Sequence, residues 1–502
     1  MEDEVWEKFS ARMRELQHLG SIGHLMGWDE QVTMPPKAAP GRAAHTGTLA
    51  ALAHERLVST EYGDLIAELG QRELPADRAA MVELAKRGRD KAVKLPARLV
   101  RDLAETASLS QLAWQQARQA DDYSIFQPML TKMLELKAEQ AEALGYEKEL
   151  YDAHLDLFER GATVEQLSPM FVSVTAGLAP ILDTAAFDGG ERTGLPPGPY
   201  EVDEVLAYCR GLLVRMGYDM DAGRLDLSAH PFTSGIGPND ARVTTRIQRD
   251  DPQEAILATL HEMGHGQYHL GLPEQWADTT IGEPVSLGVH ESQSRLWENH
   301  VGRSLAFWEG ELPQAKAALE PWRDETAEGV YRAVNRVERS LIRVKADEVT
   351  YPLHIAIRFE LELAICRGEI KTDDLPAAWN DAYERHLGIT PPSDADGVLQ
   401  DIHWSIGYLG YFPTYLIGSV YAAALFDAAT RALGGDEVVD QQFRDGNFAP
   451  LLEWLRQSVH SVGSSKMPAE VIAGAIGKPA SAGIDTDPFV AYIDRKYRAL
   501  YT

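Results

Sequence analysis

Residues 251–291 have the sequence DPQEAILATLHEMGHGQYHLGLPEQWADTTIGEPVSLGVHE, and the first half of this stretch predicts a helix. Asp251 can cap its N-terminus, Pro252 suits the first turn, and Glu254 completes a D-x-x-E capping box. Gly271 marks the C-terminal end. We therefore expect the pentapeptide HEMGH to lie on a well-delimited helix.

The pentapeptide has the HExxH pattern of zinc-dependent hydrolases. His261 and His265 are four residues apart, so their imidazoles share one helix face and can hold one ion. Glu262 lies one step round the helix, where it can reach a metal-bound water. Chance supplies about 0.04 such patterns in a chain of this composition, and the alternative is a helix with two histidines facing solvent. Gly264 is unfavourable inside a helix, which indicates close approach by another element.

Two histidines leave the coordination incomplete, and Glu291 is the best candidate for the third ligand. Glu291 lies where a second helical pattern begins, and a carboxylate from that helix gives a His₂Glu site with an open position. The HExxHxxGxxH form is excluded because Gly271 stands where it needs histidine. His269 lies too far along the helix, and we expect His290 to be structural.

Composition and charge narrow the class of protein. The 502 residues are 44% hydrophobic and 25% charged, which is typical of a soluble globular protein. The net charge of −28 argues against nucleic acid or an anionic membrane as a partner. Residues 402–426 lack Asp, Glu, Lys and Arg, but their His, Pro and Tyr content favours a buried loop and helix over a membrane span.

Cysteine usage and the N-terminus predict a cytoplasmic protein. Cys209 and Cys366 do not make a disulfide framework, so a reducing compartment fits. The first residues, MEDEVWEKFS, are acidic and lack the apolar core of a signal peptide.

Helical periodicity covers most of the chain, in residues 1–28, from about 41 to 185, near 201–217 and from 286 onward. A double proline at 35–36 stops the first helix. Residues 187–200 are rich in Gly and Pro and predict a loop. Residues 225–249 are β-branched and partly alternating, which predicts a few strands beside the HExxH helix. We expect a mostly α-helical single catalytic domain over 1–502, with two helical lobes possible.

Several blocks along the chain resemble one known family. HEMGH followed by HESQS is similar to the carboxypeptidase Taq family of zinc metallocarboxypeptidases. Further blocks agree with this family in order, namely WDEQVTMPP at 28–36, HPF at 230–232, DARVT at 240–244, IRVKAD at 342–347 and GVLQDIHW at 397–404.

The resemblance implies a multi-helix fold with a deep cleft, like angiotensin-converting enzyme and the neurolysin-type oligopeptidases. It also implies removal of single residues from peptides with a free C-terminus, broad specificity and a homodimer. Zinc is the expected metal, and cobalt can substitute because affinity alone separates divalent metals poorly.

Residues outside the HExxH helix are assigned from the same resemblance. It points to His403 and Tyr415 as hydrogen-bond donors to the oxyanion, although each could instead be a buried polar residue of the core. A free C-terminal carboxylate suits an arginine, and Arg343 is the first choice and Arg242 the second. Without the motifs, either arginine would be an ordinary surface or ion-pairing residue. The roles of His230 and Asp240 stay open, although Asp240 could orient Arg242.

Three alternatives to a carboxypeptidase remain. An endo-oligopeptidase or a dipeptidyl carboxypeptidase would use the same metal site and cut further from the end. A metal-binding scaffold without turnover would not need Glu262. An aminopeptidase is disfavoured because no GxMEN-type motif is present.

Overall fold

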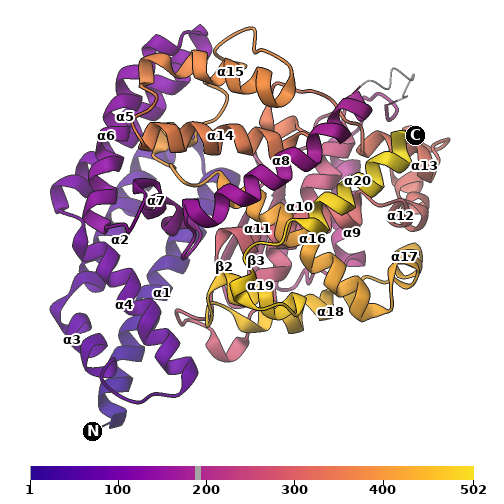
Figure 1. The fold of residues 1–502 in the computed structure, drawn as a ribbon. Helices are drawn as coiled ribbons and strands as arrows, with labels where there is room; N and C mark the ends of the chain where they lie inside the picture. Colours follow the sequence, from indigo (N-terminus) through magenta and orange to yellow (C-terminus); the bar gives the residue numbers. More distant parts are fainter. Residues whose placement is uncertain (1, 187–193, 502) are drawn as a thin grey trace. The chain divides into compact units, whose positions relative to one another are not determined.

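The computed structural model describes residues 2–186 and 194–501, and most of them are helical (Figure 1). The predicted mostly α-helical fold with a small β element is confirmed. Over the described residues the α-helices are α1 (Glu2–Val32), α2 (Ala39–Val58), α3 (Thr60–Leu69), α4 (Ala76–Lys94), α5 (Ala97–Ala120), α6 (Gln127–Leu144), α7 (Leu150–Phe158), α8 (Val164–Ala186), α9 (Val202–Arg215), α10 (Pro252–Leu270), α11 (Leu287–Arg295), α12 (Leu305–Ala318), α13 (Ala327–Val334), α14 (Tyr351–Cys366), α15 (Leu375–Leu387), α16 (Pro413–Leu433), α17 (Asp436–Arg444), α18 (Ala449–Ser458), α19 (Pro468–Ile476) and α20 (Asp487–Tyr501).

The predicted boundaries hold with small shifts. The first helix runs four residues beyond the expected position 28 and ends at Val32, before the double proline. Residues 194–200 contain no helix or strand, as predicted for that part of the loop, whereas 187–193 lie outside the described residues. The helix expected near 201–217 is α9.

The small β element is a three-stranded sheet made of β1 (Gly223–Leu227), β2 (Thr233–Gly237) and β3 (Asp240–Thr245). β3 lies in the middle, parallel to β1 and antiparallel to β2. Val243 of β3 is fully buried and faces Gly266 of α10, where an added Cβ would approach Val243 to 3.2 Å. The sheet therefore packs directly on the helix that carries HExxH.

Contacts between Cα atoms divide the chain into two compact units. The first unit comprises Met1–Val93, Arg192–Val334 and Tyr421–Ala480, and the second comprises Lys94–Glu191, Asn335–Val420 and Ser481–Thr502. The sheet, α10 and α11 belong to the first unit.

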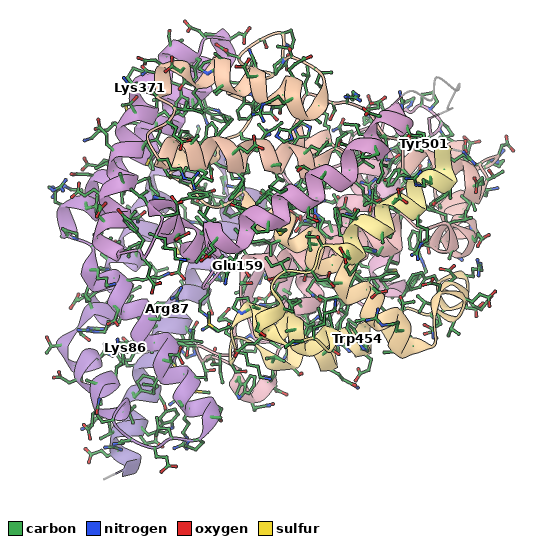
Figure 2. The ribbon with its side chains drawn as sticks, viewed as in Figure 1. Lys86, Arg87, Glu159, Lys371, Trp454 and Tyr501 are labelled. Atoms are coloured by element: carbon green, nitrogen blue, oxygen red, sulfur yellow. The ribbon has the colours of Figure 1, made fainter. Side chains whose placement is uncertain are left out.

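In the second unit, α8 and α20 lie side by side (Figure 1). A glycine allows this close approach, because a Cβ on Gly177 would come within 2.6 Å of Val490. Tyr501, labelled at the end of α20 in Figure 2, accepts a hydrogen bond of 2.7 Å from the backbone N–H of Val337.

The uncharged stretch at 402–426 forms a short 3₁₀ turn, His403–Ile406, and much of α16, which confirms the predicted loop and helix. By length and composition, Pro413–Leu433 and Val164–Thr184 are long and apolar enough to cross a membrane. In Pro413–Leu433, 72% of the apolar window is buried inside the protein, as in the core helix of a soluble protein.

Candidate metal centre and catalytic residues

Helix α10 carries the HExxH residues, and Asp251 caps its N-terminus. The Asp251 side chain accepts hydrogen bonds from the backbone N–H groups of Gln253 and Glu254, which confirms the predicted N-cap. The predicted capping box is wrong, because the Glu254 carboxylate accepts bonds from Arg246 and Gln248 instead. The Glu254 carboxylate therefore bonds Arg246 and not the backbone of the helix cap, which the spacing along the sequence had predicted.

Gly264 lies where α10 and α11 meet. A Cβ at this position would lie 2.5 Å from the backbone oxygen of Gln293 and 2.7 Å from Cα of Ser294. Real Cβ atoms essentially never come this close. The close approach predicted from this glycine is confirmed, and it brings the two helices together beside His261 and His265.

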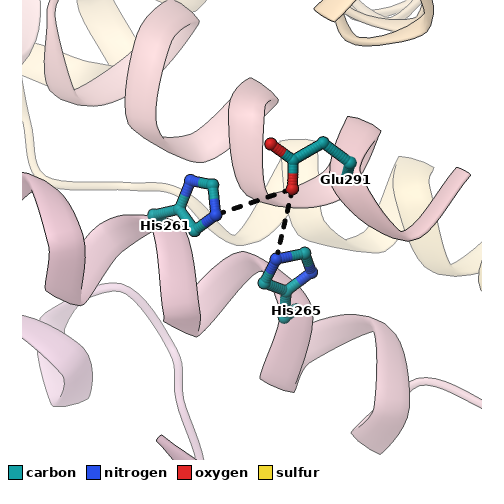
Figure 3. A group of neighbouring side chains, drawn as sticks. All are labelled: His261, His265 and Glu291. Atoms are coloured by element: carbon teal, nitrogen blue, oxygen red, sulfur yellow. Dashed lines mark ion pairs between the residues drawn. The ribbon is translucent and has the colours of Figure 1, made fainter. Parts of the chain in front are cut away.

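His261, His265 and Glu291 present their side chains to one point (Figure 3). Oε2 of Glu291 lies 3.6 Å from Nε2 of His261 and 3.5 Å from Nε2 of His265. Ligands about 2.1 Å from a tetrahedral ion are about 3.4 Å apart, so these distances fit one metal ion. Among the described residues, this is the group of His, Cys, Asp and Glu side chains that could hold an ion.

The outward nitrogen of His261 is held by a second carboxylate. Nδ1 of His261 lies 2.8 Å from Oε2 of Glu298, which follows α11 in a π-helical segment, Leu296–Gly302. A hydrogen bond at Nδ1 leaves Nε2 directed at Glu291. Burial alone would raise the pKa of Glu298, but Arg295 and His261 outweigh burial and hold this pKa well below its usual range.

His290 does not belong to the cluster of His261, His265 and Glu291 that could hold the ion, as predicted. Its Nδ1 bonds Nδ1 of His265, and the two ring centroids are 4.4 Å apart. Tyr268 also packs against His290, with ring centroids 5.5 Å apart. His290 thus holds the His265 ring with Nε2 toward Glu291. His269, which we excluded as a ligand, bonds the backbone oxygen of Gly237.

Glu262 is buried and has one hydroxyl partner. Oγ1 of Thr233, on the edge strand β2, lies 2.7 Å from Oε2 of Glu262 and 2.8 Å from its backbone oxygen. Thr233 therefore ties the carboxylate next to the metal point to the sheet. The sequence offered no signal for this residue, because the contact joins positions 29 apart.

His403, Tyr415 and Arg343 come together in the second unit. Nε2 of His403 lies 3.4 Å from the Tyr415 hydroxyl. The Arg343 guanidinium lies 5.1 Å from the centre of the Tyr415 ring, close enough for a cation–π contact. Burial lowers the pKa of His403 to about 3, so its imidazole is neutral at physiological pH.

Asp401 links two buried arginines in the same cluster. Its Oδ1 lies 2.8 Å from Nη2 of Arg343, and its Oδ2 lies 2.7 Å from Nη2 of Arg358. Arg358 is fully buried and also bonds Gln400. The two guanidiniums and one carboxylate leave one net positive charge. Arg358 escaped the sequence reasoning because nothing local distinguishes it from an ordinary helix arginine.

Arg242 lies in the first unit and is charge-paired. Its Nε and Nη2 donate to the two oxygens of Asp240 at 2.8 Å each, so Asp240 does orient it. The guanidinium also lies 4.5 Å from the centre of the Trp28 ring. His230 is exposed beside this sheet.

Comparison with known proteins identifies the family. Residues 8–497 match the family described as carboxypeptidase Taq (M32) metallopeptidase. The chain is 42% identical to thermostable carboxypeptidase 1 of Thermus thermophilus, with 97% of each chain covered. It is 35% identical to carboxypeptidase 1 of Bacillus subtilis, with full coverage of both chains. The crystal structure of an M32 carboxypeptidase from Deinococcus radiodurans superposes with a TM-score of 0.95 at 38% identity, covering 99% of each chain.

A family match over nearly the whole length, with these relatives, confirms the resemblance first seen in the sequence blocks. It also implies a divalent metal, which fits the His261, His265 and Glu291 cluster. The chain therefore belongs to the carboxypeptidase Taq (M32) metallopeptidase family and is a metallocarboxypeptidase.

Proposed function

We propose that this metallocarboxypeptidase is zinc-dependent and removes single C-terminal residues from peptides with broad specificity. The observation that carries the proposal is the pair of 3.5 and 3.6 Å distances that join Glu291 to His265 and His261. Two imidazoles and one carboxylate are the ligand set of catalytic zinc sites that keep a position open. Cobalt can occupy the same set, because divalent metals are poorly separated by affinity.

A bound zinc ion would supply a water of pKa near 7 and polarise the scissile carbonyl. Glu262 would accept a proton from the attacking water and deliver it to the leaving amine. Thr233 supports that role, because its hydroxyl lies 2.7 Å from Oε2 and holds the carboxylate in one orientation.

His403 and Tyr415 are proposed to donate hydrogen bonds to the oxyanion that develops on the carbonyl. Each such donor is worth about 3–4 kcal/mol in the transition state. The lowered pKa of His403 supports this role, since a neutral imidazole can donate one hydrogen bond without carrying charge.

Arg343 is proposed to bind the free carboxylate of the substrate. Its cluster with Arg358 and Asp401 has one positive charge in excess, which suits an incoming carboxylate. Arg242 is the weaker candidate, because Asp240 already neutralises it through two hydrogen bonds.

We further propose a cytoplasmic homodimer that uses neither nucleic acid nor membrane as a partner. Cys209 and Cys366 are free thiols, which suits a reducing compartment. Sedimentation of the purified chain tests the dimer, and a monomer would overturn it.

Digestion of a peptide and its C-terminally amidated form, followed by mass spectrometry, tests the activity. We expect a ladder of single-residue losses from the free peptide alone, abolished by a chelator and restored by Zn²⁺. Equal cleavage of the amidated peptide, or loss of dipeptides, would instead favour the endo-oligopeptidase or dipeptidyl carboxypeptidase. Metal binding without any cleavage would favour a scaffold.

Two arginine variants test which residue binds the free carboxylate of the substrate. Arg343→Ala should raise KM or lower kcat/KM for free-carboxylate peptides while leaving the zinc content unchanged. Arg242→Ala serves as the comparison, and a larger loss in this variant would assign this role to Arg242.

A further inference from the structure

Arg295 lies between two buried glutamates, Glu291 and Glu298, beside the residues that could hold the metal. Glu291 and Arg295 lie four residues apart on α11, and Glu298 follows three residues later in the π-helical segment Leu296–Gly302. All three side chains are largely buried, and Arg295 is only 15% exposed. A buried group of charges of this kind has a fixed geometry, unlike a solvent-exposed ion pair.

Arg295 gives the two oxygens of Glu291 different surroundings. Nε of Arg295 donates to Oε1 of Glu291 at 2.7 Å. The other oxygen, Oε2, faces Nε2 of His261 and Nε2 of His265 at 3.6 and 3.5 Å, and the Ser294 hydroxyl lies 3.1 Å from it. One oxygen is thus turned toward the arginine and the other toward the metal point.

The same guanidinium also holds Glu298 against His261. Nη1 of Arg295 lies 3.1 Å from Oε2 of Glu298, the oxygen that Nδ1 of His261 contacts at 2.8 Å. Arg303 holds the opposite oxygen, Oε1, at 3.2 Å. Arg295 therefore connects the support of one ligand, Glu291, with the support of another, His261.

We propose that Arg295 is a positioning residue for the metal centre, which makes Glu291 bind through Oε2 alone and keeps His261 directed at the ion. This inference rests on the proposed site of His261, His265 and Glu291. With Oε1 engaged, Glu291 occupies one coordination position instead of two. The position so spared remains available to water and substrate.

The positive charge of Arg295 and its positioning role predict opposite changes in metal affinity when the residue is removed. This contrast makes the proposal testable. By charge alone, removing Arg295 would strengthen metal binding, because like charges repel. By positioning, removing it frees Glu291 to rotate and loosens Glu298, which weakens binding. Loss of a residue that orients metal ligands typically costs about 10–100-fold in metal affinity.

The experiment measures Zn²⁺ affinity of the full-length apo-protein by competition with a chromophoric chelator, and visible absorption after Co²⁺ loading. The variants are Arg295→Met and Arg295→Lys. We expect about 10–100-fold weaker binding in Arg295→Met, since both contacts are lost. Arg295→Lys should also bind more weakly, although it retains the charge, because a lysine lacks the guanidinium fork.

In Arg295→Met, the Co²⁺ bands should weaken as Glu291 becomes bidentate and the coordination number rises. Arg215→Lys is the matched control. It alters another arginine of the first unit, whose Nε lies 3.1 Å from the buried Glu311, and it should leave Zn²⁺ affinity unchanged.

Tighter binding in Arg295→Met with unchanged Arg295→Lys would overturn the proposal in favour of a charge effect. Unchanged affinity and spectra in variants with a lowered Tm would reduce Arg295 to a structural ion pair. If Arg295→Met does not fold, Arg295→Lys still decides the question, because it keeps the positive charge and loses only the guanidinium fork. Failure of the wild-type chain to bind Zn²⁺ would instead refute the proposed function.

Discussion

Replacing Gly264 by alanine would place a methyl group where α10 and α11 meet. The new Cβ would lie 2.5 Å from the backbone oxygen of Gln293. Backbone atoms cannot turn aside as the end of a flexible side chain can. Restoring an ordinary contact of 3.4 Å requires a relative movement of the two helices of about 0.9 Å.

This movement affects stability and the metal site differently. Overpacking costs about 1–3 kcal/mol, of which the better helix propensity of alanine offsets about 1 kcal/mol. The net loss in the free energy of unfolding is therefore modest, up to about 2 kcal/mol. Glu291 moves with α11, and its distances of 3.5 and 3.6 Å to the histidines become too long for one tetrahedral ion. We expect Zn²⁺ affinity to fall at least about tenfold.

Thermal unfolding of the apo-protein and chelator competition for Zn²⁺ measure the two effects separately. Gly88→Ala is the matched control, because Gly88 follows Lys86 and Arg87 on α4 (Figure 2) and has no atom within 4 Å of an added Cβ. This control should gain up to about 1 kcal/mol and keep its metal affinity. If Gly264→Ala behaves like Gly88→Ala in both assays, the tight contact between α10 and α11 does not position Glu291.

Further predictions concern proton transfer, orientation and pH. Glu262→Gln should retain Zn²⁺ and lower kcat by about 10²–10⁴-fold; near-normal turnover would remove it as the general base. Thr233→Val should lower kcat more than it changes KM, by roughly 5–10-fold for one lost hydrogen bond, whereas Thr233→Ser should recover most of it. Because burial lowers the pKa of His403 from 6.5 to about 3, its NMR signals should show no titration near pH 6.5. As the pH falls, the unfolded chain binds this proton before the folded chain does, so the free energy of unfolding decreases below about pH 6.5. The His403→Gln variant should show a smaller decrease over the same pH range. Asp251→Ala should lower the free energy of unfolding by about 1 kcal/mol in denaturant titrations, since it removes the cap of α10; an unchanged midpoint would contradict this.

Local sequence determined the parts of this protein that depend on neighbours along the chain. The helix cap at Asp251, the shared face of His261 and His265, and the close approach at Gly264 all follow from spacing and residue type. Helical periodicity likewise predicted the mostly α-helical fold and the strands before α10. These features are predictable because dihedral preferences and helix geometry act over one or two turns.

Only the tertiary structure decided which distant side chains meet. Thr233 contacts Glu262, Arg358 shares Asp401 with Arg343, and Arg246 takes the carboxylate of Glu254 away from the predicted cap. A polar side chain takes whichever partner the fold brings within about 3 Å, and periodicity carries no information about that partner. The sequence by itself therefore determined the metal-binding helix, whereas packing between elements determined which side chains orient its histidines and its glutamates.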